Sequence, residues 1–193
     1  MPQETKRTIP SDLIEATAFE LMRRAAIEIP EDFRLGVEAM VDTEAEDLSR
    51  FVLESMVENW HAAEEDRRAM CADTGLPRYY VKAGNEAVIG GGFVALERAL
   101  RRATARATHE IPLRPNRVHP LSRADHNNNV GINAPEIEFS FEPDADWLDI
   151  TTVHKGGLFG TDYRMLFPGD GKDGIKRFFL DTMMQFGRRG LAC

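Results

Sequence analysis

The spacing of apolar residues changes at Met70, and this change constrains the fold more than any other feature of the sequence. Upstream, apolar residues recur every three or four positions, as on one face of a helix. The sequence therefore predicts an α+β fold, with a helical segment over 1–69 and mixed strands and helices over 70–193. Three downstream segments alternate apolar with polar residues and predict strands: 78–83 (RYYVKA), 136–141 (EIEFSF) and 147–153 (WLDITTV).

Five helices are expected from the helical spacing. Ser11 is the predicted N-cap of the first helix. The second follows Pro30, and the third covers 44–68 with Leu48 and Val52 on its buried face. The last two are predicted after the glycines at 90–92 and over 173–189. With 193 residues the chain can build one sizeable core, so we expect a single domain over 1–193.

A long polar connection over 110–135 separates the fourth helix from the second strand. It contains three arginines, two histidines and five asparagines. A segment of this length without regular structure is usually functional or disordered. Its proline and asparagine content favours a fixed path rich in turns. We therefore expect a functional loop here.

The charge balance argues against a nucleic-acid partner. The formal net charge is −8, from 32 acidic and 24 basic residues, whereas binding to phosphates needs a basic surface. No apolar run approaches the roughly 18 residues that suggest a membrane span, and the first 15 residues have no apolar stretch of the signal-peptide kind. We expect a cytoplasmic protein with no membrane or nucleic-acid partner.

The turn MCADTG places a thiol, a carboxylate and a hydroxyl within four residues. Asp73 and Thr74 could serve chemistry, or they could form a helix cap or an Asx-turn. Cys71 and Cys193 are too few for a disulfide scaffold. They could be buried small side chains, metal ligands or one reactive residue.

Two further segments could bind an anion. Arg114 could form a bidentate pair with a carboxylate, or it could be an ordinary surface arginine. In HKGG, the amides of Gly156 and Gly157 could approach a carboxylate, although a simple turn also explains the glycines. The sequence shows no zinc-site spacing and no P-loop, HExxH, GxSxG or dinucleotide-binding fingerprint.

Four segments together resemble the α-region of class I iron–sulfur fumarate hydratases and L(+)-tartrate dehydratases. Residues 71–75 (CADTG) resemble the family's C-x-D-T-G signature, and 112–116 (PLRPN) resemble its PLRxN segment. Residues 155–157 (KGG) stand where the family has a KGGG loop. Residues 168–193 resemble the stretch that leads to the second cluster cysteine. The similarity covers essentially the whole chain in the family's order.

The resemblance implies a hydro-lyase that removes water from a 2-hydroxy dicarboxylic acid. In that family three cysteines hold a [4Fe–4S] cluster whose open iron acts as a Lewis acid. Cys71 and Cys193 would be two of these ligands, and Asp73 the acid that protonates the departing hydroxyl. The implied substrate-binding residues are Asp73, Thr74, Arg114, Gly156 and Gly157.

The resemblance also implies a partner. The base that takes the carbon-bound proton would come from a β-subunit or β domain, and the assembly would be a dimer or a heterotetramer. The substrate would be a small dicarboxylate. Family α-subunits continue beyond the position of Cys193 and hold the third cysteine there, so we expect this chain to lack that C-terminal portion. Ala72 and Leu158 depart from the family pattern.

Two other interpretations remain open on the sequence. The chain could be a truncated, non-catalytic α-subunit module that serves folding or subunit association. It could also be an unrelated α+β domain in which both cysteines are core thiols. Iron content separates these from the enzyme, because neither alternative binds iron stoichiometrically.

Overall fold

The structure is a computed structural model that describes residues 7–156 and 163–188. The helices fall where the sequence predicts them: α1 (Ser11–Ile27), α2 (Glu31–Thr43), α3 (Asp47–Asp66), α4 (Gly92–Glu110) and α5 (Gly171–Arg188). The predicted strands are β2 (Leu76–Gly84), β4 (Glu136–Glu142) and β5 (Leu148–Lys155). Three short elements were not predicted: β1 (Thr8–Ile9), β3 (Val88–Ile89) and the 3₁₀ helix η1 (Pro168–Asp170). The α+β prediction is confirmed.

The chain divides into two compact units, Met1–Lys155 and Gly156–Cys193. In the second unit, η1 leads into α5. The Asp170 carboxylate accepts the N–H of Phe167 at 2.7 Å, which fixes the turn before α5. The expectation of a single domain over 1–193 stays a prediction.

A three-stranded sheet forms the centre of the first unit. Its order is β4-β2-β5, and β2 runs parallel to β4 and antiparallel to β5. Although β4 and β5 are consecutive in the chain, they do not pair with each other. Strand β2 lies between them, so Val81 faces Phe139 on one side and Ile150 on the other.

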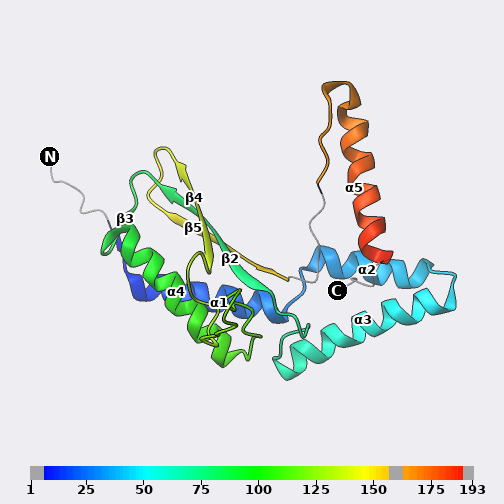
Figure 1. Cartoon of the computed structure of the whole chain (residues 1–193), viewed down its shortest axis with the longest axis horizontal. Helices are drawn as coiled ribbons and strands as arrows, with labels where there is room; N and C mark the ends of the chain where they lie inside the picture. Colours follow the sequence, from blue (N-terminus) through cyan, green and yellow to red (C-terminus); the bar gives the residue numbers. More distant parts are fainter. Residues whose placement is uncertain (1–6, 157–162, 189–193) are drawn as a thin grey trace. The chain divides into compact units, whose positions relative to one another are not determined.

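Helices α1 and α4 pack against each other and against one face of this sheet (Figure 1). The alternation of β2 explains this face, because Pro77, Tyr79, Val81 and Ala83 are buried while the residues between them are not. Between the helices and the sheet lies the core, to which α1 contributes Ile14, Ala18 and Met22 and α4 contributes Leu96, Leu100 and Ala103.

The Tyr79 hydroxyl is buried in this core and has partners there. It lies 2.8 Å from the sulfur of Met22 and 3.0 Å from Oγ1 of Thr104. Burial raises the pKa of the Tyr79 hydroxyl well above its usual value, and the Thr104 contact partly opposes this rise. Because buried hydroxyls need a hydrogen-bond partner, these two contacts make a polar side chain compatible with the core.

The other face of the sheet carries charged and aromatic side chains. Arg78 pairs with Glu136, and Lys82 pairs with Glu142, both across neighbouring strands. The Lys82 ammonium also lies 5.8 Å from the ring centre of Trp147. The two ion pairs both join β2 to β4 and support the register of this parallel pair.

Two details of the helix prediction are wrong. Ser11 is the first residue of α1 rather than its N-cap; Pro10 takes the cap position and makes no side-chain cap bond. Leu48 and Val52 are 77% and 45% exposed instead of buried. Helix α3 turns Trp60 and Ala63 inward instead, and the Trp60 ring packs against Phe33 of α2 with ring centres 5.9 Å apart.

No helix among the described residues is long and apolar enough to span a membrane.

Candidate functional site

The turn that carries Cys71, Asp73 and Thr74 connects α3 to β2 and is anchored on both sides. The side-chain amide of Asn59 in α3 donates to the carbonyl of Met70 at 2.8 Å. The N–H of Met70 donates to the carbonyl of Ala26 in α1 at 3.1 Å. At the far end Gly75 has φ +73°, a backbone conformation that favours glycine. The turn therefore enters β2 with a defined geometry.

The Asp73 carboxylate is buried in the wall of this turn, and the residue is only 9% exposed. Its Oδ1 accepts a hydrogen bond from Nδ2 of Asn116 at 3.1 Å. The same Nδ2 donates to the carbonyl of Gly75 at 3.1 Å. Nη1 of Arg114 lies 3.8 Å from Oδ1 of Asp73. A carboxylate and a guanidinium thus stand side by side.

Thr74 ties the turn to the segment that carries Arg114. Its Oγ1 accepts the N–H of Arg114 at 2.9 Å, although the two residues are 40 positions apart. The Arg114 side chain is 59% exposed, so an anion from solvent can reach its guanidinium. Arginine binds carboxylates well because its planar fork matches two carboxylate oxygens.

The connection over 111–135 builds the other wall of the site. Asn127, Asn129 and Asn133 all have φ between +54° and +55°, a region that asparagine tolerates better than most residues. Arg101 of α4 donates to the carbonyls of Gly131 at 2.8 Å and Ala134 at 3.0 Å. The predicted fixed path rich in turns is therefore what the structure shows.

A family model described as Fumarate hydratase (Fumerase) matches residues 15–193, more than nine-tenths of the chain. The chain belongs to the fumarate hydratase (Fumerase) family. The predicted family relationship is confirmed.

Curated proteins that are similar to this chain support the assignment to the fumarate hydratase family. The putative L(+)-tartrate dehydratase subunit alpha of Methanocaldococcus jannaschii is 35% identical over 179 residues, which cover 90% of this chain and 62% of the relative. The L(+)-tartrate dehydratase subunit alpha of Escherichia coli strain K12 is 25% identical over 186 residues, covering 95% and 60%. The chain therefore spans about three-fifths of the length of these relatives.

The structure brings together three of the predicted site residues: Asp73, Thr74 and Arg114. Cys71 is half-buried in the same turn. Gly156 is described but belongs to the second unit, while Gly157 and Cys193 lie outside the described residues. No helix begins within 71–75, so the helix-cap alternative for Asp73 is wrong.

Sequence reasoning assigned no role to several residues that complete this site. Asn116 stands in the family-like PLRPN segment, and Asn129 stands in the run HNNNVGIN. Their signal was the density of asparagines beside prolines and glycines, which indicates side chains that replace backbone partners in turns. The sequence could not show which asparagine meets Asp73, because the two residues are 43 positions apart.

His154 of β5 supports the turn from behind. It faces Pro77 in the β2–β5 register, and its Nε2 donates to the carbonyl of Met22 in α1 at 3.0 Å. Burial lowers the pKa of His154, and the backbone groups of Met22 and Thr74 partly oppose this effect. A neutral imidazole is therefore favoured at this position.

The described residues could supply only some of the ligands that an iron–sulfur cluster needs. Iron–sulfur clusters in proteins are held mainly by cysteine thiolates, and Cys71 is the one cysteine within the described ranges. Those ranges contain no group of three or more His, Cys, Asp or Glu side chains able to hold a metal ion. Cys71 thus fits a cluster as one ligand among several, and the others must come from segments outside 7–156 and 163–188.

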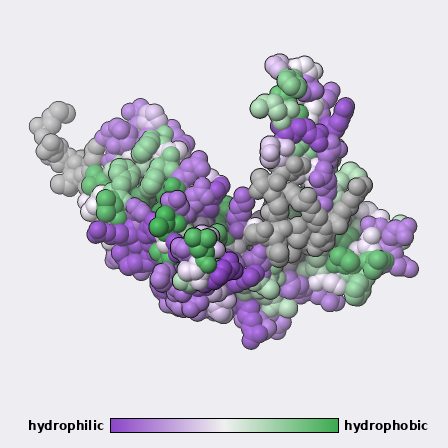
Figure 2. Space-filling view, in the orientation of Figure 1, coloured by the Kyte–Doolittle hydropathy of each residue, from purple (hydrophilic) through white to green (hydrophobic). Residues whose placement is uncertain are grey.

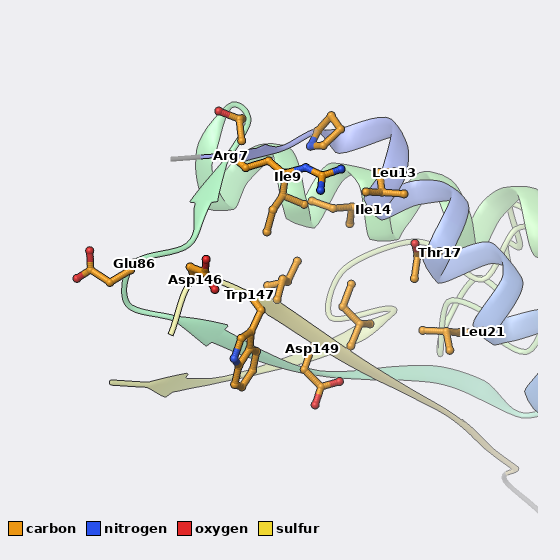
Figure 3. A pocket seen from close by; sticks show the side chains of 14 residues that line it. Arg7, Ile9, Leu13, Ile14, Thr17, Leu21, Glu86, Asp146, Trp147 and Asp149 are labelled. Carbon is orange, nitrogen blue, oxygen red and sulfur yellow. The ribbon is translucent and has the colours of Figure 1, made fainter. Parts of the chain in front are cut away.

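A separate pocket of about 740 Å³ lies between the start of α1 and β5 (Figure 3). Ile9, Leu13 and Ile14 form part of its apolar lining, and Asp146 and Asp149 also line it. In Figure 3 the Trp147 ring and the Asp149 carboxylate point away from α1. None of the predicted site residues lines this pocket, so we place the candidate site at the Asp73 turn.

Proposed function

We propose that this chain supplies the acid and the substrate-binding arginine of an iron–sulfur hydro-lyase of the fumarate hydratase or tartrate dehydratase type. The observation that supports this most is the pairing of the buried Asp73 carboxylate with the exposed Arg114 guanidinium, 3.8 Å apart, in the turn that also carries Cys71. The substrate would be a 2-hydroxy dicarboxylic acid. Family membership and the names of the relatives support the reaction class.

Arg114 would bind one carboxylate of the substrate. Its backbone N–H donates to Oγ1 of Thr74 at 2.9 Å, so the point at which the side chain begins is held next to the Asp73 turn. Positioning of this kind lowers the barrier by holding reacting groups in a productive orientation. Gly156 and Gly157 would add backbone N–H donors for the same substrate.

Asp73 would donate the proton with which the hydroxyl leaves. As the C–O bond breaks, the hydroxyl takes this proton and departs as water; the neighbouring carbon loses its own proton to a base, and the C–H electrons form the double bond. That base would come from the partner. In the hydration direction, Asp73 would take the proton back.

The cofactor would be a [4Fe–4S] cluster, which when bound supplies a Lewis acid that polarises the C–O bond. Cys71 and Cys193 would be two of its ligands. The remaining ligand and the catalytic base would come from the rest of the α-subunit and from a β-subunit. That the relatives are named alpha subunits supports such a partner, and we expect a dimer or a heterotetramer.

Anaerobic reconstitution tests this proposal. The chain, completed as an α-subunit and assembled with its β partner, is loaded with iron and sulfide and assayed with malate, fumarate and both tartrate enantiomers. We expect stoichiometric iron and sulfide and turnover of at least one diacid. Cys71→Ser should abolish both, while Ser49→Ala on the exposed face of α3 should leave both unchanged. Full iron content and full turnover in Cys71→Ser would contradict the assignment.

A further inference from the structure

The Asn129 side chain lies at the centre of the hydrogen bonds that fix the segment carrying Arg114. Its Oδ1 accepts the N–H of Asn116 at 2.7 Å, and its Nδ2 donates to the carbonyl of Arg114 at 3.0 Å. One side-chain amide therefore binds the peptide groups on both sides of Pro115, as a neighbouring backbone amide would. Asn129 is only 1% exposed, so each lost bond would leave a buried polar group unpaired.

Asn129 also connects this segment to the packed core. Its Nδ2 donates to Oγ1 of Thr108 in α4 at 3.2 Å. Thr108 is buried, and its hydroxyl lies 2.8 Å from the carbonyl of Thr104 one turn earlier. Because α4 packs directly on α1, the position of Asn129 is set by a rigid element. Positions built on helices are more precise than positions set by loops alone.

The two residues that Asn129 fixes are the two that meet Asp73. Asn116 donates to the Asp73 carboxylate, and the Arg114 guanidinium lies 3.8 Å from it. A displaced 114–116 segment would move both contacts together. Chemical positioning of this kind is sensitive, since a misplacement of about 1 Å can cost about 100-fold in rate.

We propose that Asn129 is a positioning residue of the hydro-lyase, which sets the Arg114 guanidinium relative to the Asp73 carboxylate and so fixes how the diacid is held. This inference rests on the proposed function. Asn129 does not itself contact the substrate; it acts through the backbone of Arg114 and Asn116.

Asn129→Gly is the decisive variant, because the φ of +55° at this residue suits glycine. The side-chain amide is lost without added backbone strain. Asn127→Gly is the matched control, since Asn127 has the same φ but is exposed. In the reconstituted assembly we expect kcat/KM for the diacid to fall about 100-fold for Asn129→Gly. The control should stay within about twofold.

A double-variant comparison separates positioning from a general loss of structure. If Asn129 acts through Arg114, then Asn129→Gly should lower kcat/KM much less when Arg114 is already replaced by Lys, because coupled residues are not additive. The same fold-loss in both backgrounds would overturn the proposal.

Hydrogen exchange of the Asn116 amide provides a test that needs no activity. Asn129→Gly should expose this amide to exchange, whereas Asn129→Asp keeps an acceptor oxygen and should keep it protected. Asn129→Asp should still lose activity, because it no longer donates to the Arg114 carbonyl. If the wild-type assembly converts no diacid, the proposed function fails. Unchanged Asn116 exchange in Asn129→Gly would instead overturn the positioning role itself.

Discussion

Two regions of the first unit differ in which side chains they bury. One is the Asp73 turn together with the connection over 111–135, and the other is the α2–α3 hairpin. At the turn, polar side chains are buried and bonded: Asp73 and Asn129 are 9% and 1% exposed. On the hairpin, large apolar side chains are exposed, with Leu48 at 77% and Phe51 at 64%. Figure 2 shows apolar residues gathered at the end of the hairpin where α2 meets α3.

The charge of the two regions differs as well. Residues 31–66, which form the hairpin, contain twelve acidic and two basic residues, whereas the connection over 111–135 contains one acidic and three basic residues. This contrast indicates that the residues proposed for chemistry lie at the turn and its neighbouring connection, and that the exposed face of the hairpin contributes little to the stability of this chain. The hydrogen bonds of the connection over 111–135 fix the positions of Asp73 and Arg114, so single substitutions there should alter activity. Changes on the exposed hairpin should alter little within this chain.

The largest effect is expected at Asp73. Asp73→Asn keeps the size of the side chain and removes its acid, so turnover should fall about 10²- to 10⁴-fold if it is the general acid. Circular dichroism and thermal unfolding should show an intact fold. Asp149→Asn, on the exposed side of β5, is the control and should keep its activity. Retained turnover in Asp73→Asn would remove Asp73 from the chemistry.

The next effect concerns stability. Leu100 of α4 is fully buried in the core that α4 forms with α1 and the sheet. Leu100→Ala should therefore lower the free energy of unfolding by about 2–5 kcal/mol. The same substitution at exposed Leu48 should change it by no more than about 0.5 kcal/mol. Urea unfolding of both variants measures the contrast. Equal losses would mean that the hairpin end is buried in solution.

A smaller effect is expected where α4 supports the loop. The sequence presents Arg98, Arg101, Arg102 and Arg106 as one basic, solvated helix face. The structure singles out Arg101, which donates to the carbonyls of Gly131 and Ala134. Arg101→Met should cost about 1–3 kcal/mol of unfolding free energy through these charge-assisted bonds, and exposed Arg98→Met should be nearly neutral. Equal unfolding midpoints for the two would contradict this distinction.

Much of the fold could be predicted because helices and strands have different apolar periods. The alternation over 78–83 and the helical spacing of Leu96, Leu100 and Ala103 are visible in the sequence, and the structure buries Tyr79, Val81 and Ala83 of β2 and these three residues of α4. The periodicity does not show which apolar helix face packs against another element. Leu48 and Val52 have helical spacing, yet no other described element covers them.

The candidate site was predictable in part, for a different reason. Asp73, Thr74 and Arg114 stand in short segments similar to family motifs, and the structure places them together. The residues that join them could not be read from the sequence, because the contact between Asn116 and Asp73 spans 43 positions and that between Asn129 and Arg114 crosses a loop. Local spacing carries no information about such contacts.

The smallest effect concerns pH. Burial lowers the pKa of His154 below its ordinary value of 6.5, so below that pH the unfolded chain binds a proton that the folded chain resists. His154 should therefore destabilise the fold as pH falls from 7.5 towards 5.5, by at most about 1.4 kcal/mol per pH unit. His154→Gln should flatten this part of the stability profile, measured by urea unfolding. An equally steep loss of stability in His154→Gln would contradict this assignment.

A structure of the complete assembly with a bound 2-hydroxy diacid tests the central claim most directly. We expect one substrate carboxylate on the Arg114 guanidinium and the substrate hydroxyl within about 2.6–3.2 Å of an Asp73 carboxylate oxygen. A diacid bound away from both residues, or held by Arg114 with its hydroxyl turned away from Asp73, would contradict the claim that this turn performs the elimination.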